Sequence, residues 1–142
     1  MVTTHFLPTA NFLAIFVSAL AYFAFGYVWF SLLFAKVRNV ELEKIGVKMS
    51  RPAGNKMAMK MLYTFAGNFL GAMAIAYVFH HLGVTTIDRG LKVGLIMGIG
   101  FTSSTLAIAY PWEDKSIKLF IIDAGHYVVG LLVCSLILSS WR

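Results

Sequence analysis

Four long apolar runs limit what this chain can fold into. They cover residues 12–34, 61–82, 91–109 and 119–139. A hydrocarbon core about 30 Å thick is crossed by about 20 helical residues at a rise of 1.5 Å each. Because an unpaired backbone amide costs several kcal/mol in lipid, each run must close its own hydrogen bonds as an α-helix. The sequence therefore predicts an all-α membrane protein, with residues 1–142 forming one compact bundle of four transmembrane helices.

The composition of the chain supports the same environment. Apolar residues make up 59% of the sequence and charged residues 13%. Twelve basic and six acidic side chains cannot cover a soluble domain of this size with a polar shell. We therefore expect an integral membrane protein whose surroundings are the lipid bilayer, in a bacterial inner (plasma) membrane.

The basic residues predict how the helices are oriented. Nine of them fall in the first and third connections, namely Lys36, Arg38, Lys44, Lys48, Arg51, Lys56, Lys60, Lys115 and Lys118, against Arg89, Lys92 and Arg142 on the opposite side. This bias favours both odd-numbered connections in the cytoplasm and both termini outside. The net charge of +6 is then a topology signal, so we expect no nucleic-acid partner.

The connections leave two local questions. Residues 37–45 either form a short interfacial helix that ends at Gly46 or lie as a basic loop against anionic headgroups. Pro52 indicates the start of the second spanning helix, Gly83 its end, and Pro111 a break after the third.

Small residues predict where helices approach closely. Gly90, Gly94 and Gly98 recur every four residues on the third run, and Gly67 and Gly71 repeat the spacing on the second. Helices in lipid associate mainly by close packing, which such smooth faces permit. The neighbour is either a helix of the same chain or one of another subunit, so we expect a homo-oligomer or other membrane subunits as partners.

Polar residues inside the runs carry the functional signal. Asp123, His126, Gly130 and Cys134 share one stripe of the fourth run, with Gly130 as its packing residue. A charged group facing hydrocarbon costs at least a few kcal/mol, so this stripe must face protein or water.

Depth suggests a polar layer. Asn68, Thr102, His126 and Tyr27 each lie seven residues from the cytoplasmic end of their run, or roughly 10 Å below its boundary at the helical rise. The structural interpretation places Asp123 at the interface near Lys115 or Lys118 and lets His126 bond Asn68 or a threonine. The functional interpretation makes Asp123 and His126 a proton relay or a solute-binding pair, because imidazole changes its protonation near neutral pH.

Two segments resemble a known family. They are Asn11 with Gly26-Tyr27-Val28-Trp29-Phe30-Ser31 and Phe34, and Trp112-Glu113 with Lys118-Leu119-Phe120-Ile121-Ile122-Asp123-Ala124-Gly125-His126-Tyr127. With these motifs the chain resembles a four-helix integral membrane family known only as a domain of unknown function. Family members often have Tyr-Ser-Pro where this chain has Phe30-Ser31-Leu32. The resemblance implies the four-helix topology over nearly the whole chain, and it implies no activity.

Enzyme chemistry finds little support in the sequence. Cys134 is the single cysteine, which excludes a disulfide or a cysteine-based metal site within one chain. His80 and His81 are adjacent, so they point to different helix faces and do not form a metal-binding pair. We expect no catalytic residues, no metal and no cofactor. Two functions remain: passage of a proton or small solute along the polar layer, in an oligomer, or a structural or accessory role in a larger membrane complex.

Overall fold

The computed structural model describes residues 5–48, 50 and 52–141. Arg51 and Arg142, which were counted above for orientation, lie outside the described residues. Regular secondary structure in the described part is helical throughout: α1 Phe6–Thr9, α2 Phe12–Tyr27, η1 Val28–Leu33, α3 Ala35–Lys44, α4 Asn55–Leu82, α5 Ile87–Ile96, η2 Met97–Ser103, α6 Ser104–Trp112 and α7 Ile117–Ser140. The two η elements are π-helical turns that continue an α-helix.

Four helices of the described chain are long and apolar enough to cross a membrane. They span Phe12–Leu33, Asn55–Leu82, Ile87–Trp112 and Ile117–Ser140. The first and third are each continuous through a π turn, whereas the second and fourth are α4 and α7 alone. The prediction of an all-helical protein with four spanning helices packed against one another is confirmed.

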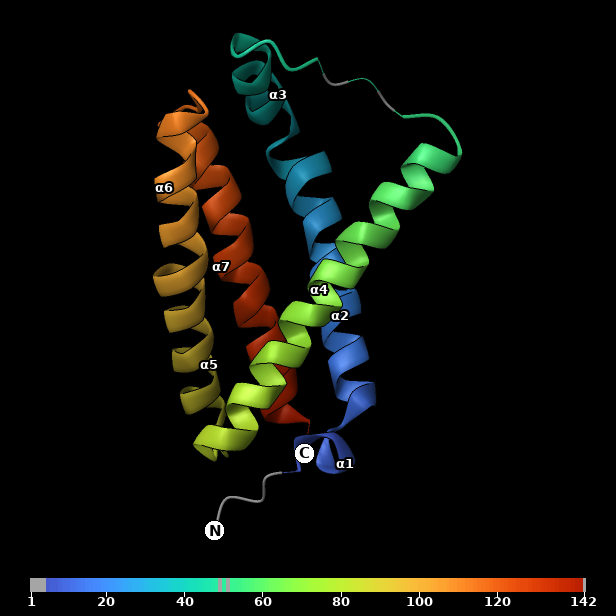
Figure 1. Ribbon diagram of the computed structural model, residues 1–142, viewed down its shortest axis with the longest axis vertical. Coiled ribbons are helices and arrows are strands. Elements are labelled where there is room, and N and C mark those ends of the chain that lie inside the picture. Colours follow the sequence, from blue (N-terminus) through green and yellow to red (C-terminus); the bar gives the residue numbers. More distant parts are fainter. Residues whose placement is uncertain (1–4, 49, 51, 142) are drawn as a thin grey trace.

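The helix α7 is the centre of the bundle. It packs against α2, α4, α5, η2 and α6. In its most apolar stretch of 18 residues, half of the residues are buried inside the protein, whereas the share is 17% for α4 and for the α5–η2–α6 helix. In Figure 1 the α5–η2–α6 helix runs along one side of α7, and α2 along the other. Contacts that join the whole molecule are therefore made mainly on α7.

The helix α4 belongs to the bundle over only part of its length. Its buried residues Ala72, Ile75 and Phe79 lie in its C-terminal half, whereas Met61, Leu62 and Tyr63 are exposed. Figure 1 shows α4 crossing α2 and leaning away from the other helices toward its N-terminus. We call the end of the bundle near α1 the α1 end, and the opposite end, where α3 lies, the α3 end.

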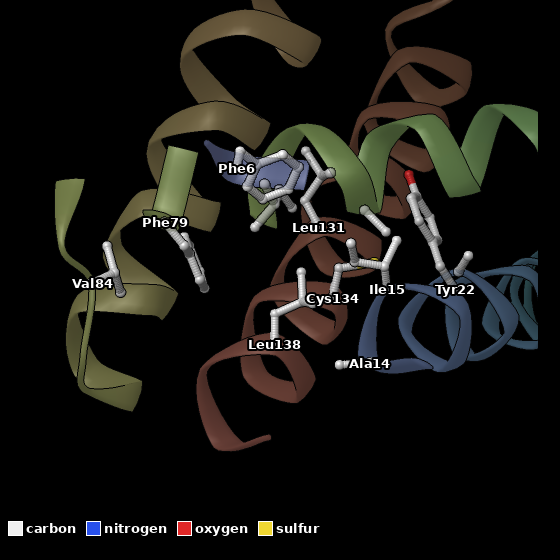
Figure 2. Close-up of a cluster of buried hydrophobic side chains, with 12 residues drawn as sticks. Phe6, Ala14, Ile15, Tyr22, Phe79, Val84, Leu131, Cys134 and Leu138 are labelled. Carbon is white, nitrogen blue, oxygen red and sulfur yellow. The ribbon is translucent and has the colours of Figure 1, made fainter. Parts of the chain in front are cut away.

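The main core fills the α1 half of the bundle (Figure 2). Ile15 and Tyr22 of α2 pack with Leu131 and Cys134 of α7 and with Phe79 of α4. Phe6 of α1 and Val84 of the loop after α4 also belong to this cluster. A separate small cluster of Leu42, Tyr110 and Leu119 holds the α3 end together.

The observed helix ends agree in part with those predicted from the sequence. The Asn11 side chain accepts a hydrogen bond from the Ala14 amide at 3.0 Å and so caps α2, and Gly83 ends α4 in the left-handed conformation that favours glycine. The segment after the first span is the helix α3, which ends at Lys44, with Ile45 as its C-cap just before Gly46. The third span continues through Pro111 and ends at Trp112, one residue beyond the predicted break.

Candidate functional site

The helices α2 and α7 run antiparallel in a fixed register, and the residues that meet in it are chemically distinctive. A Cβ on Gly26 would lie 3.0 Å from Nε2 of His126, and a Cβ on Gly130 would fall inside the Tyr22 ring. One turn further along each helix, the Cys134 thiol lies 3.5 Å from the Ser18 carbonyl oxygen. Glycines therefore let two rings enter the contact between the helices, one from each side.

The π turn η1 brings a second pair of rings onto α7. The Trp29 indole Nε1 donates a hydrogen bond to the Ile122 carbonyl at 2.9 Å, and a Cβ on Gly125 would lie 3.1 Å from the Trp29 ring. The Phe30 ring is 4.5 Å from that of His126, centroid to centroid. Both segments that carry the family resemblance thus face each other at one place. Single π turns inside α-helices are often found at functional sites.

His126 lies in an aromatic enclosure. Its ring is stacked on Phe25 at 5.7 Å and lies 5.3 Å from the Tyr22 ring, and the residue is 6% exposed. Neither ring nitrogen has a hydrogen-bond partner among the described residues. A buried polar group left without a partner costs about 1–3 kcal/mol, so the fold tolerates a penalty at this position.

Asp123 lies one turn nearer the α3 end and is held from two sides. The Arg38 guanidinium Nε lies 3.3 Å from Oδ1, and the Tyr110 hydroxyl donates a hydrogen bond to Oδ2. These partners come from α3 and α6. The structural interpretation places Asp123 near Lys115 or Lys118, but its charged partner is Arg38, and Lys115 is engaged by Glu113 and by the Tyr110 ring.

The helix α3 closes this end of the bundle. Leu42 packs on Tyr110 and Leu119, and Glu41 is buried beside them. The Glu41 carboxylate accepts hydrogen bonds from Lys44, at 2.6 Å, and from Ser116, which hold the pKa of Glu41 below its usual range. Ser116 also caps α7 by accepting from the Leu119 amide at 3.2 Å. The cap of α7 and the docking of α3 thus share one hydroxyl.

The predicted layer of four polar side chains is not assembled around His126. Tyr27 is 61% exposed, and the Thr102 hydroxyl bonds the Met97 carbonyl of its own helix at 3.5 Å. Asn68 is half-buried and makes no hydrogen bond within the described chain. His126 likewise bonds neither Asn68 nor a threonine. The buried polar side chains of the spanning helices instead run lengthwise along α2 and α7: Ser18, Asp123, His126, Ser135 and Ser139.

The predicted packing glycines divide into two groups. Gly90 and Gly94 lie against Ser139 and Ser135 of α7, and a Cβ on Gly98 would be 3.0 Å from the Val128 Cα. For this face the neighbour is a helix of the same chain. Gly67 and Gly71 have nothing within 4 Å of an added Cβ, so the described chain makes no close approach there.

Sequence reasoning missed the stripe of α2 that contacts α7, and it missed Arg38. Ala14, Ser18, Tyr22 and Gly26 recur every four residues on α2, so the stripe that meets α7 was readable from spacing. Arg38 gave no such signal, since its charge is one of many in a basic segment. The described residues hold no cluster of three or more His, Cys, Asp or Glu side chains arranged for a metal ion.

Comparison with known proteins identifies the family of the chain. No curated protein and no solved structure matches the chain. One family model, described as "Protein of unknown function (DUF1761)", matches residues 13–139. This range begins in α2 and ends in α7, so it covers the four spanning helices except for the first residue, Phe12, and the last, Ser140. The chain therefore belongs to this family of membrane-spanning helical proteins, as the sequence motifs predicted.

Proposed function

We propose that the protein passes protons, alone or together with a small solute, across the membrane along the contact between α2 and α7. The observation that carries the proposal is the buried His126 imidazole, whose two nitrogens are left without partners one turn from a carboxylate. An imidazole can take up a proton at one nitrogen and release one from the other. A buried histidine with a purely structural role would be expected to use at least one ring nitrogen in a hydrogen bond.

Polar groups continue the line on both sides of His126. Toward the α3 end stands Asp123, which can receive a proton once Arg38 moves away from it. Toward the α1 end the Tyr22 ring lies next, and one turn further is the buried Ser18 hydroxyl, which has no partner among the described residues. One more turn leads to Ala14, which lines a cavity of about 500 Å³ at the α1 end together with the polar residues Thr9 and Asn11. This cavity can hold water, because a water takes up about 30 Å³ of liquid.

The orientation of the pathway follows from charge. The α3 end carries the basic connection, so we infer that it faces the cytoplasm of a bacterial cell and that the cavity beside α1 faces the outside. In this arrangement Arg38 and α3 cover the cytoplasmic exit. Protons enter from the cavity and leave through Asp123.

Proton flux into liposomes containing the purified protein tests the proposal. A pH-sensitive dye trapped inside the liposomes reports their acidification. Proton entry is driven by an inside-negative membrane potential or by a step to lower pH outside. We expect flux with the wild type, loss of flux in His126→Gln, and unchanged flux in the matched control His81→Gln, whose ring is exposed near the α1 end. Detergent melting of each variant shows whether it is folded. A wild type without flux, or a folded His126→Gln variant with full flux, would contradict proton passage.

A second candidate function is that of a subunit in a larger membrane assembly, and the glycine face at the middle of α4 favours it. Gly67 and Gly71 present a smooth open surface there, and the Asn68 amide beside them has no hydrogen bond within the described chain at the middle of the span. An amide in hydrocarbon gains from a partner on another helix. Mass determination in mild detergent separates the cases: co-purifying subunits support this role, whereas the chain alone or a homo-oligomer contradicts it.

A further inference from the structure

A hollow of about 760 Å³ lies between α1 and the outward face of α4. Leu70, Ala74 and Tyr77 form its wall on α4, and Leu7 and Pro8 form its wall on α1. Its α4 wall lies within a helix that is long and apolar enough to cross the membrane, on the side away from the buried residues Ala72 and Ile75. The hollow therefore opens toward hydrocarbon and not toward the line between α2 and α7.

The α1 wall is fixed in place. Phe6 is buried, and its ring meets the Tyr77 ring edge-on at 5.4 Å and the His80 ring at 5.7 Å. The Thr9 hydroxyl donates to the His5 carbonyl at 3.1 Å, which closes the single turn of α1. A wall held in this way shapes a site, whereas an ordinary lipid-facing helix surface has one side only.

The volume of the hollow is large enough for one acyl chain. At about 30 Å³ for a group the size of a methylene, which is the share of liquid volume that one water takes, a chain of 16 carbons needs about 480 Å³. The volume thus fits one acyl chain, and acyl chains are what the apolar outward face of a membrane-spanning helix meets in a bilayer.

One end of the hollow is polar. His5 lines it and is exposed, and the Tyr77 ring lies 4.1 Å from that of His81. Rings with a polar edge favour the level of the lipid headgroups. We propose that this hollow binds one acyl chain of a phospholipid from the leaflet at the α1 end, with the headgroup beside His5, and retains it while the surrounding lipids exchange. The proposal is independent of proton passage.

Native mass spectrometry tests retention. The protein is reconstituted with phosphatidylglycerol and phosphatidylethanolamine, transferred to mild detergent and measured with its bound lipid. We expect one phospholipid per chain to survive in the wild type and to be lost in Ala74→Trp, whose indole fills the hollow. The matched control Ala66→Trp, an exposed site two turns away on the same helix, should keep the lipid. Equal retention by the two variants, or no retained lipid in the wild type, would overturn the proposal.

Crosslinking in the unmodified chain keeps the test independent of variant folding. A phospholipid with a photoreactive group in its acyl chain is incorporated into the same vesicles, and the labelled residues are mapped by peptide mass. Labels should concentrate on 70–78 and on 7–8. Labels spread evenly over the exposed faces of α4 and of the α5–η2–α6 helix would show ordinary surrounding lipid and would refute a retained chain.

Discussion

The Asp123 carboxylate shows what a single residue contributes to this fold. It joins α7 to α3 through Arg38 and to α6 through Tyr110, at the α3 end of the bundle. The pair is largely but not fully enclosed, with 25% of the Arg38 side chain and 12% of the Asp123 side chain exposed. Breaking such a pair from one side leaves the other charge without compensation, whereas removing both charges does not.

A double-mutant cycle on Asp123 and Arg38 measures this effect. We expect Asp123→Asn and Arg38→Gln each to lower the free energy of unfolding in detergent, by about 1–3 kcal/mol, and the double variant to be more stable than the sum of the two losses predicts. Chemical unfolding followed by tryptophan fluorescence gives the three values. Strict additivity would mean that the ion pair does not hold α3 to α7.

At the scale of the elements, glycines decide which helix faces can touch. Gly94 lies so close to α7 that an added methyl group would overlap the Ser135 side chain, whereas Gly67 faces open space. The two positions have the same residue type and the same role in a four-residue spacing. They differ in what the fold places opposite them.

Alanine at these two positions should therefore have opposite effects. We expect Gly94→Ala to destabilise the bundle by about 1–3 kcal/mol through overpacking, and Gly67→Ala to be neutral or stabilising by up to about 1 kcal/mol, since alanine favours the helix. Thermal melting in detergent compares them directly. A loss of stability in Gly67→Ala would instead indicate that a second chain covers that face.

The attachment of α3 should depend on pH through Glu41. Hydrogen bonds from Lys44 and Ser116 lower the pKa of Glu41 below its ordinary value of 4.5. The stabilisation is therefore fully present above pH 4.5, and it is lost as the pH falls through the lowered pKa of the docked state. We expect a spin label on α3 to become more mobile at acidic pH in the wild type.

Glu41→Gln should abolish most of this change in mobility, because the variant has no carboxylate to titrate there. Glu43→Gln, at an exposed position on the same helix, is the matched control and should keep the wild-type pH profile. If Glu41→Gln keeps that profile too, another group controls the attachment of α3.

For the whole molecule, the sequence predicted the four spans because the length of an apolar run is set by the bilayer alone. The sequence did not predict which side chains contact one another in the site. Depth placed Tyr27 and Thr102 level with His126, but depth carries no information about helix faces, and Tyr27 is exposed while Thr102 bonds its own backbone. Arg38 reaches Asp123 only because a segment counted for its charge folds back as α3.

The orientation of the molecule is open to direct measurement. We expect Lys48→Cys, in the exposed connection after α3, to escape an impermeant thiol reagent added to intact cells, because the proposed orientation places the basic connections in the cytoplasm. Thr85→Cys, exposed at the opposite end, should be labelled. Cys134 is fully buried and leaves the signal clean. Labelling of the first variant from outside would invert the pathway proposed above.

The central place of α7 also bears on how the protein is made. It is the fourth of the spanning helices along the chain, and it supplies the surface that receives the Gly94 face, the Tyr22 ring and the Trp29 indole. While a ribosome is still producing residues before 117, those surfaces stand in the bilayer without their counterpart. During synthesis there is therefore an interval in which these surfaces lack α7. A nascent chain stalled during it would keep the packing of α2 on α4 but would expose the faces of α2, η1 and α5 that α7 covers in the complete bundle.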